Sequence, residues 1–137
     1  MSRLHGETDR LYDEYWRLVD LWRFYVRLMI EATTLFAAIS GGMISYALGS
    51  EADFEKIAPA LLVPGGLGAG FAIISFWGVF QSRELASSLK VLGEESGIKQ
   101  VVHVWLLPRI VSMATVFYAA TSIASFHLAW PVLKSSF

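Results

Sequence analysis

Three long runs of apolar residues, separated by polar segments, dominate the chain. The runs cover residues 32–49, 61–80 and 106–130. A bilayer core about 30 Å thick is crossed by about 20 mostly apolar residues in a helix. Backbone groups in lipid must be hydrogen-bonded internally, which favours helices over irregular chain. The pattern therefore predicts an all-α integral membrane protein with three transmembrane helices in a single domain, residues 1–137.

The segment before the first run predicts an amphipathic helix over residues 8–31. Thr8 can cap its start, with Asp9 in the first turn. No proline follows before Gly49, so the helix is expected to continue into the first span. One of its faces carries apolar residues at the alternating spacing of a coiled-coil seam. These residues are Tyr12, Tyr15, Val19, Trp22, Val26 and Met29.

Residues 81–105 extend the second span as a polar helical segment. Leu85, Leu89 and Leu92 keep one face of it apolar, and Gly93 and Gly97 are expected to end it. We expect this leucine face to pack against the 12–26 face. The alternative is that residues 12–26 lie flat on the membrane surface, where aromatic and arginine side chains are favoured. At the far end of the chain, Pro131 is expected to stop the third span.

The distribution of lysine and arginine orients the chain. Membrane proteins carry an excess of these residues on the cytosolic side. The flanks with most of them are the N-terminal segment and the 81–105 segment, whereas the other two flanks hold only Lys56 and Lys134. The N-terminus is therefore predicted in the cytosol and the C-terminus outside. The predicted outer loop is acidic, with Glu51, Asp53 and Glu55.

Small residues recur at helical spacing in the spans. They are Thr33, Ala37, Gly41 and Ser45 in the first span, and the GxxxG pair Gly66 and Gly70 in the second. Lipid tails are as apolar as leucine, so helices associate in membranes through close packing, which small residues permit. We interpret these positions, with the 12–26 face, as contacts between copies in a homo-oligomer. Packing within one subunit is the alternative.

Glu31 is a charged residue at the inner boundary of the first span. It follows Arg27 by four residues, the spacing of a helical ion pair. In an oligomer it could instead form an acidic ring at the mouth of a pore. Both interpretations stay open at this point.

Catalytic and cofactor motifs are not evident in the sequence. The chain has no cysteine, which excludes disulfides and thiolate metal sites. His103 and His127 fall at opposite ends of one span, so one chain cannot pair them around a haem. A net charge of -1 without a basic run gives no reason to expect nucleic acid binding. We therefore expect a protein that is not an enzyme, with no cofactor and no metal.

An aromatic and arginine-rich segment leads into the membrane hairpin. It runs Tyr15-Trp16-Arg17 and then Trp22-Arg23-Phe24-Tyr25-Val26-Arg27. Over roughly residues 9–92 this architecture resembles two groups of small bacterial membrane proteins, the SLATT-type effectors and the RipA-like octameric proteins. The resemblance implies a homo-oligomer of the bacterial inner membrane that could form a pore. The third span is an addition to that pattern.

These observations favour a small homo-oligomeric inner-membrane protein, either pore-forming and channel-like or a membrane scaffold. Membrane lipid and further copies of the chain are its expected partners. The alternative is a non-catalytic accessory subunit of a larger membrane complex. A partner protein would then bind the cytosolic helix 12–26 or the acidic outer loop.

Overall fold

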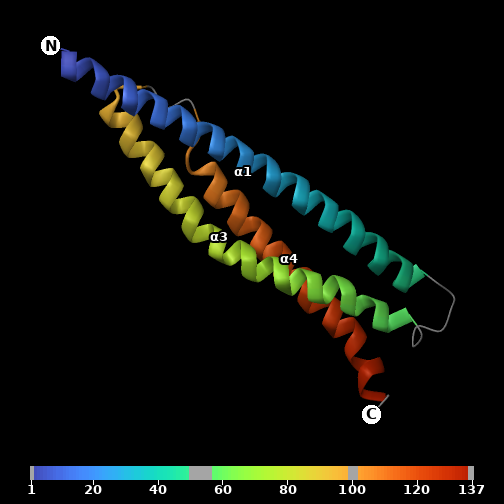
Figure 1. The fold of residues 1–137 in the computed structure, drawn as a ribbon. Coiled ribbons are helices and arrows are strands. Elements are labelled where there is room, and N and C mark those ends of the chain that lie inside the picture. The colour runs from blue at the N-terminus through green and yellow to red at the C-terminus, as the bar shows by residue number, and fades with distance from the viewer. Residues whose placement is uncertain (1, 50–56, 99–101, 136–137) are drawn as a thin grey trace.

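Three long helices make up the chain, which is all-helical over the described residues (Figure 1). The computed structural model describes residues 2–49, 57–98 and 102–135, with the side chains of residues 2–8, 133 and 135 excepted. Helix α1 spans Ser2–Gly49, the short 3-10 helix η1 spans Ala58–Leu61, α3 spans Leu62–Glu95 and α4 spans Leu106–Ser135. The acidic loop predicted at Glu51, Asp53 and Glu55 lies outside the described residues.

Each of the three helices is long and apolar enough to cross a membrane. They contain 48, 34 and 30 residues. At 1.5 Å per residue these lengths are about 72, 51 and 45 Å, all above the thickness of a bilayer core. Helices α1 and α4 run in the same direction and α3 runs against both, so the two chain ends lie at opposite ends of the molecule (Figure 1).

The predicted helix boundaries are right at some ends and wrong at others. Helix α1 ends at Gly49 as expected, but it begins at Ser2 and not at Thr8. The only weak helix former before Thr8 is Gly6, which costs about 1 kcal/mol and does not interrupt a helix. Helix α4 continues through Pro131 to Ser135, so the predicted stop at this proline is wrong. A proline removes only its own N–H bond, and the residues after it can keep helical geometry.

Gly97 ends α3 because it adopts a left-handed conformation, with φ of +66°. The amide of Ile98 then donates to the carbonyl of Gly93 at 3.1 Å, and the amide of Gly97 donates to that of Glu94 at 3.4 Å. This is the Schellman arrangement, which satisfies the last carbonyls of a helix. The expectation that Gly97 ends the helix is confirmed, whereas Gly93 lies inside α3 and is buried.

Helices α3 and α4 form the closest pair, and α1 packs along both. Three buried clusters follow the length of α1. The first lies around Trp22, the second around Phe36 and the third around Ala47. The core is therefore a thin seam shared by three helices, and most large apolar side chains outside it are exposed.

Candidate interaction surfaces

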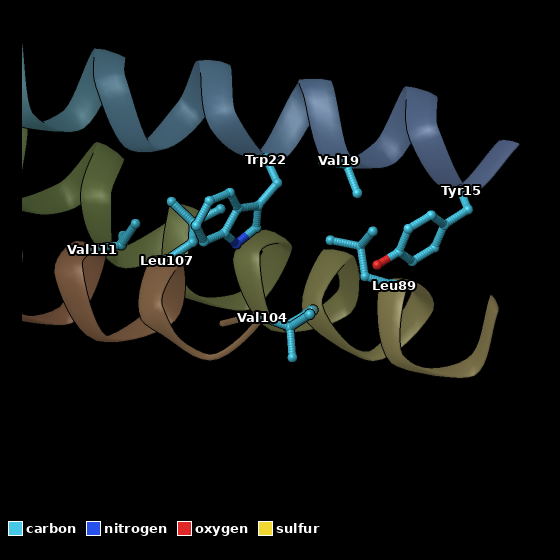
Figure 2. Close-up of a cluster of buried hydrophobic side chains, with 8 residues drawn as sticks. Tyr15, Val19, Trp22, Leu89, Val104, Leu107 and Val111 are labelled. Atoms are coloured by element: carbon cyan, nitrogen blue, oxygen red, sulfur yellow. The ribbon is translucent and has the colours of Figure 1, made fainter. Parts of the chain in front are cut away.

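One face of α1, here called the packed face, contacts α3 and α4. Its residues follow one another at spacings of three, four or seven: Tyr15, Val19, Trp22, Val26, Met29, Thr33, Phe36, Ser40 and Ala47. Figure 2 shows Tyr15, Val19 and Trp22 on the side of α1 that faces Leu89 of α3 and Leu107 and Val111 of α4, and Val104, just before α4, belongs to the same buried cluster. The 12–26 segment is therefore packed against the leucine-bearing part of α3 within one chain, with Leu85 and Leu92 beside the same cluster.

Tyr12 departs from that expectation, because its side chain is 49% exposed. The end of α3 explains the difference. A Cβ on Gly93 would lie 3.4 Å from the ring of Tyr15, so the last turn of α3 is level with Tyr15. Tyr12 lies one turn beyond it and has no helix opposite. Its ring contacts Trp16 at 6.1 Å between centroids instead.

The opposite side of α1, here called the open face, is exposed along its apolar half. Its residues also alternate at spacings of four and three: Arg27, Glu31, Thr34, Ala38, Gly41 and Ser45. All six are exposed. A Cβ placed on Gly41 or on the adjacent Gly42 would meet no atom within 4 Å. The open face therefore presents a smooth strip of small residues that no other helix of the chain covers.

The predicted small-residue positions of α1 are divided between the two faces. Thr33 belongs to the packed face, where its hydroxyl lies 2.9 Å from the hydroxyl of Tyr118 on α4. Ala37 is half-buried, and Gly41 and Ser45 are on the open face. The strip expected at i+4 spacing turns around the helix because 3.6 residues make one turn.

Glu31 accepts a hydrogen bond from the Nε of Arg27 at 2.7 Å. This bond, and after it the negative charge of Glu31, raises the pKa of the Arg27 guanidinium above its ordinary value. Both side chains are exposed on the open face. The ion-pair interpretation is therefore the one that the geometry of a single chain supports.

The GxxxG pair of α3, Gly66 and Gly70, faces away from α1 and α4. A Cβ on either glycine would meet no atom within 4 Å. The glycines that approach α4 are their neighbours. A Cβ on Gly68 would lie 2.9 Å from the carbonyl oxygen of Tyr118, and one on Gly65 would lie 3.4 Å from the Cβ of Ser125. Any role for the GxxxG pair in contact with a second molecule stays a prediction.

The close contact between α3 and α4 was not predicted from the sequence. Ser122 of α4 donates a hydrogen bond to the carbonyl of Gly65 at 2.8 Å. A signal was present in the spacing, since the residues of α3 on this side alternate at four and three. They are Gly65, Gly68, Ala72, Ser75, Val79, Ser82, Ala86, Leu89 and Gly93, and Leu61 at the end of η1 precedes them at the same spacing. The small residues in this series let the two backbones approach closely.

A groove of about 610 Å³ is lined by residues of all three helices. It is bordered by residues within 21–29 of α1, 73–85 of α3 and 107–111 of α4. Arg27, Arg83 and Arg109 fall within these three stretches. Val26 and Met29, next to Arg27, pack against the cluster that contains Leu107 and Val111 of α4. Arg27, Arg83 and Arg109 therefore lie toward the same end of the bundle.

A second hollow, of about 780 Å³, lies between α3 and α4 and is here called the arginine hollow. Arg83 of α3 borders it, and so do Arg109 and Trp105 at the start of α4. Glu84 borders it as well. Within the part of the chain that the structure describes, neither arginine makes an ion pair.

Comparison with protein-family models, with curated proteins and with solved structures finds no match. The resemblance to SLATT-type and RipA-like membrane proteins, and the bacterial inner membrane that it implies, therefore stay predictions.

Proposed function

We propose that the chain is a multi-pass membrane protein that assembles with copies of itself and acts as a membrane scaffold without catalytic activity. Its N-terminus would lie in the cytosol and its C-terminus outside. The observation that carries the proposal is the open face of α1, a strip of small residues that the chain leaves uncovered.

The exposed surface supports a position in the membrane. Large apolar side chains are exposed on each of the three helices, among them Leu35 of α1, Ile74 of α3 and Ile123 of α4. Apolar surface of this extent in water would cause aggregation. Lipid tails solvate it instead, and the end of the bundle that carries these arginines then marks the cytosolic boundary.

Contact between copies follows from the kind of residue on the open face. Close approach of two backbones provides the attraction that hydrophobicity cannot provide in lipid. Long side chains such as Leu48 and Ile73 cover much of the remaining exposed surface and keep neighbouring helices apart, and the GxxxG pair Gly66 and Gly70 is a second, shorter patch of small residues. All copies of the chain share one orientation in the membrane, so the open faces of two α1 helices can meet in parallel.

A scaffold fits this face better than an acidic pore does. Glu31 shares the open face with Gly41, and Arg27 already neutralises its charge. Assembly through this face would place a paired charge at the cytosolic end of the contact. A channel-like assembly in which Glu31 faces a pore, and an accessory role beside another protein, are outcomes of the test below.

The test is the substitution Gly41→Leu, with Ala120→Leu as its control. A Cβ on Gly41 would meet no atom of the described residues within 4 Å, so the new side chain should leave the three-helix fold intact and interfere with a second molecule. Ala120 is an exposed small residue on α4, outside the open face. The mass of the purified protein in detergent should be a discrete multiple of 15.2 kDa for the parent and the control, and should fall for Gly41→Leu.

Three results would contradict the proposal. An unchanged oligomeric mass for Gly41→Leu excludes the open face as the contact. Co-purification of a different chain in fixed proportion supports the accessory role. Conductance in planar bilayers that changes with Glu31→Gln supports the channel-like assembly and its acidic pore mouth.

A further inference from the structure

The arginine hollow holds two guanidinium groups without a counter-ion. Arg83 comes from α3 and Arg109 from α4, and both border the same cavity. Among the described residues neither makes an ion pair, although the carboxylate of Glu84 lies on the rim. Two exposed arginines of α1 differ in this respect, because Arg23 and Arg27 pair with acidic residues of their own helix.

The other polar groups of the hollow favour an anion. It lies at the N-terminal end of α4, where the helix dipole is positive. Trp105 is half exposed there, and its indole N–H makes no hydrogen bond with any described residue. The hydroxyls of Ser87 and Ser112 already donate to carbonyls of their own helices. The guanidinium groups and the indole N–H are therefore the donors that remain for an anion.

The surface beyond the hollow changes from cationic to apolar along one direction. On α3, Phe80 and Phe76 lie one and two turns from Arg83 toward the other end of the helix. On α4, Met113 and Val116 follow Arg109 at spacings of four and three in the same direction. All four side chains are exposed, and none of them is charged. This surface, cationic at one end and apolar at the other, is complementary to a lipid with an anionic headgroup and apolar acyl chains.

We propose that the arginine hollow binds the phosphate group of an anionic phospholipid, whose acyl chains lie along Phe76, Phe80, Met113 and Val116. The proposal rests on the membrane position that forms part of the proposed function. Arginine binds phosphate oxygens through paired N–H donors, and basic pockets between membrane helices on the cytosolic side suit anionic headgroups. Occupancy would join α3 and α4 at the bilayer surface.

The two arginines alone would attract any anion. The apolar surface next to them is the feature that favours a lipid phosphate over a soluble one. A soluble phosphate gains nothing from the apolar surface beyond the hollow, whereas an acyl chain covers it. The two sources can therefore be separated by a probe that has the headgroup and lacks the chains.

The experiment uses the full chain in detergent and native mass spectrometry to count bound lipids. Phosphatidylglycerol and phosphatidylcholine with identical acyl chains are compared for the parent protein and for Arg83→Gln/Arg109→Gln. Each arginine near a membrane surface contributes about fivefold to the affinity for anionic lipid, so the double variant should lose about 25-fold for phosphatidylglycerol. Binding of phosphatidylcholine should not change. Arg83→Lys/Arg109→Lys, which keeps the charges, should recover part of the loss.

Arg17→Gln/Arg23→Gln is the matched control, because it removes the same charge from exposed positions of α1 outside the hollow. Equal losses in both double variants would show general electrostatic attraction and overturn the site. Displacement of the lipid by millimolar glycerol phosphate would assign the hollow to a soluble anion and also overturn the proposal.

Failure of the membrane position gives a different result from failure of the site. In that case the parent chain would be extracted from vesicles by alkaline carbonate, whichever lipids they contain. A chain that stays in the vesicles and shows no preference for phosphatidylglycerol overturns the lipid site alone.

Discussion

Helix α3 has four glycines within six residues, and the side of the helix on which each lies decides whether it contacts α4. Gly65 and Gly68 face α4, whereas Gly66 and Gly70 face away from the chain. The sequence pointed to the second pair because it forms a GxxxG motif. Motif spacing identifies a face that small residues share, but it does not tell which face the neighbouring helix covers. That choice depends on the rotation of α3, which the large residues Leu61 and Leu89 set by being buried at its two ends.

The close contact at Gly68 predicts a loss of stability when a methyl group is added there. In Gly68→Ala the new Cβ would lie 2.9 Å from the carbonyl oxygen of Tyr118 and 3.2 Å from the Cβ of Ser122, so α3 and α4 must separate. Overpacking of this kind costs about 1–3 kcal/mol. Gly66→Ala should instead be neutral or stabilising by up to about 1 kcal/mol, since alanine favours the helix and meets no neighbour. Unfolding of both variants in a denaturing-detergent titration, followed by circular dichroism, measures the difference. Equal stabilities would mean that α3 is rotated differently.

At the scale of the helices, the sequence was sufficient for lengths and for most boundaries. The helices and their ends at Gly49 and near Gly97 could be predicted because apolar runs and glycines act locally, within a single helix. The errors at Thr8 and Pro131 have the same origin. A capping residue and a proline allow a helix to end, but neither requires it to. Contacts between helices were harder, because α1 carries two regular faces and both have the spacing of a seam. Only the position of α3 and α4 distinguishes the packed face from the open face.

Pairing of α3 with α4 can be tested by a disulfide, since the natural chain has no cysteine. In Gly65→Cys/Ser125→Cys the two Cβ atoms would be 3.4 Å apart, close to the separation of about 3.5–4.5 Å in disulfides. Mild oxidation should therefore link the two helices within one chain. After digestion at Lys90, the fragments should stay together on a non-reducing gel and separate on reduction. Gly66→Cys/Ser125→Cys is the control, because Gly66 faces away from α4. Linkage in the control and not in the test pair would place Gly66, the sequence-based choice, against α4.

At the scale of the whole molecule, the direction of the helices and the distribution of charge lead to one topology. Helices α1 and α4 run in the same direction and α3 runs against both, so the two chain ends lie at opposite ends of the molecule (Figure 1). The arginines of the N-terminal flank, together with Arg83 and Arg109, belong to the same end of the bundle. Lysine and arginine are retained on the cytosolic side of membranes, and the proposed orientation, with this end in the cytosol, rests on that rule.

Fusions of a reporter to each end should therefore behave oppositely. A phosphatase that folds only outside the cytosol should be active after Phe137 and inactive before Met1, and a fluorescent protein that folds only in the cytosol should show the reverse. Because retention depends on positive charge near the spans, Arg23→Glu/Arg27→Glu should weaken the preference and produce some molecules with phosphatase activity at the N-terminus. Arg3→Glu/Arg10→Glu is the matched change farther from the span and should have less effect, since the charges that act lie within about 15–20 residues of the membrane. Reporter activity on the same side for both ends would contradict three crossings. It would point instead to one helix lying along the membrane surface, and α1 would be the first to examine, because its residues 2–27 carry most of the charge of the N-terminal flank.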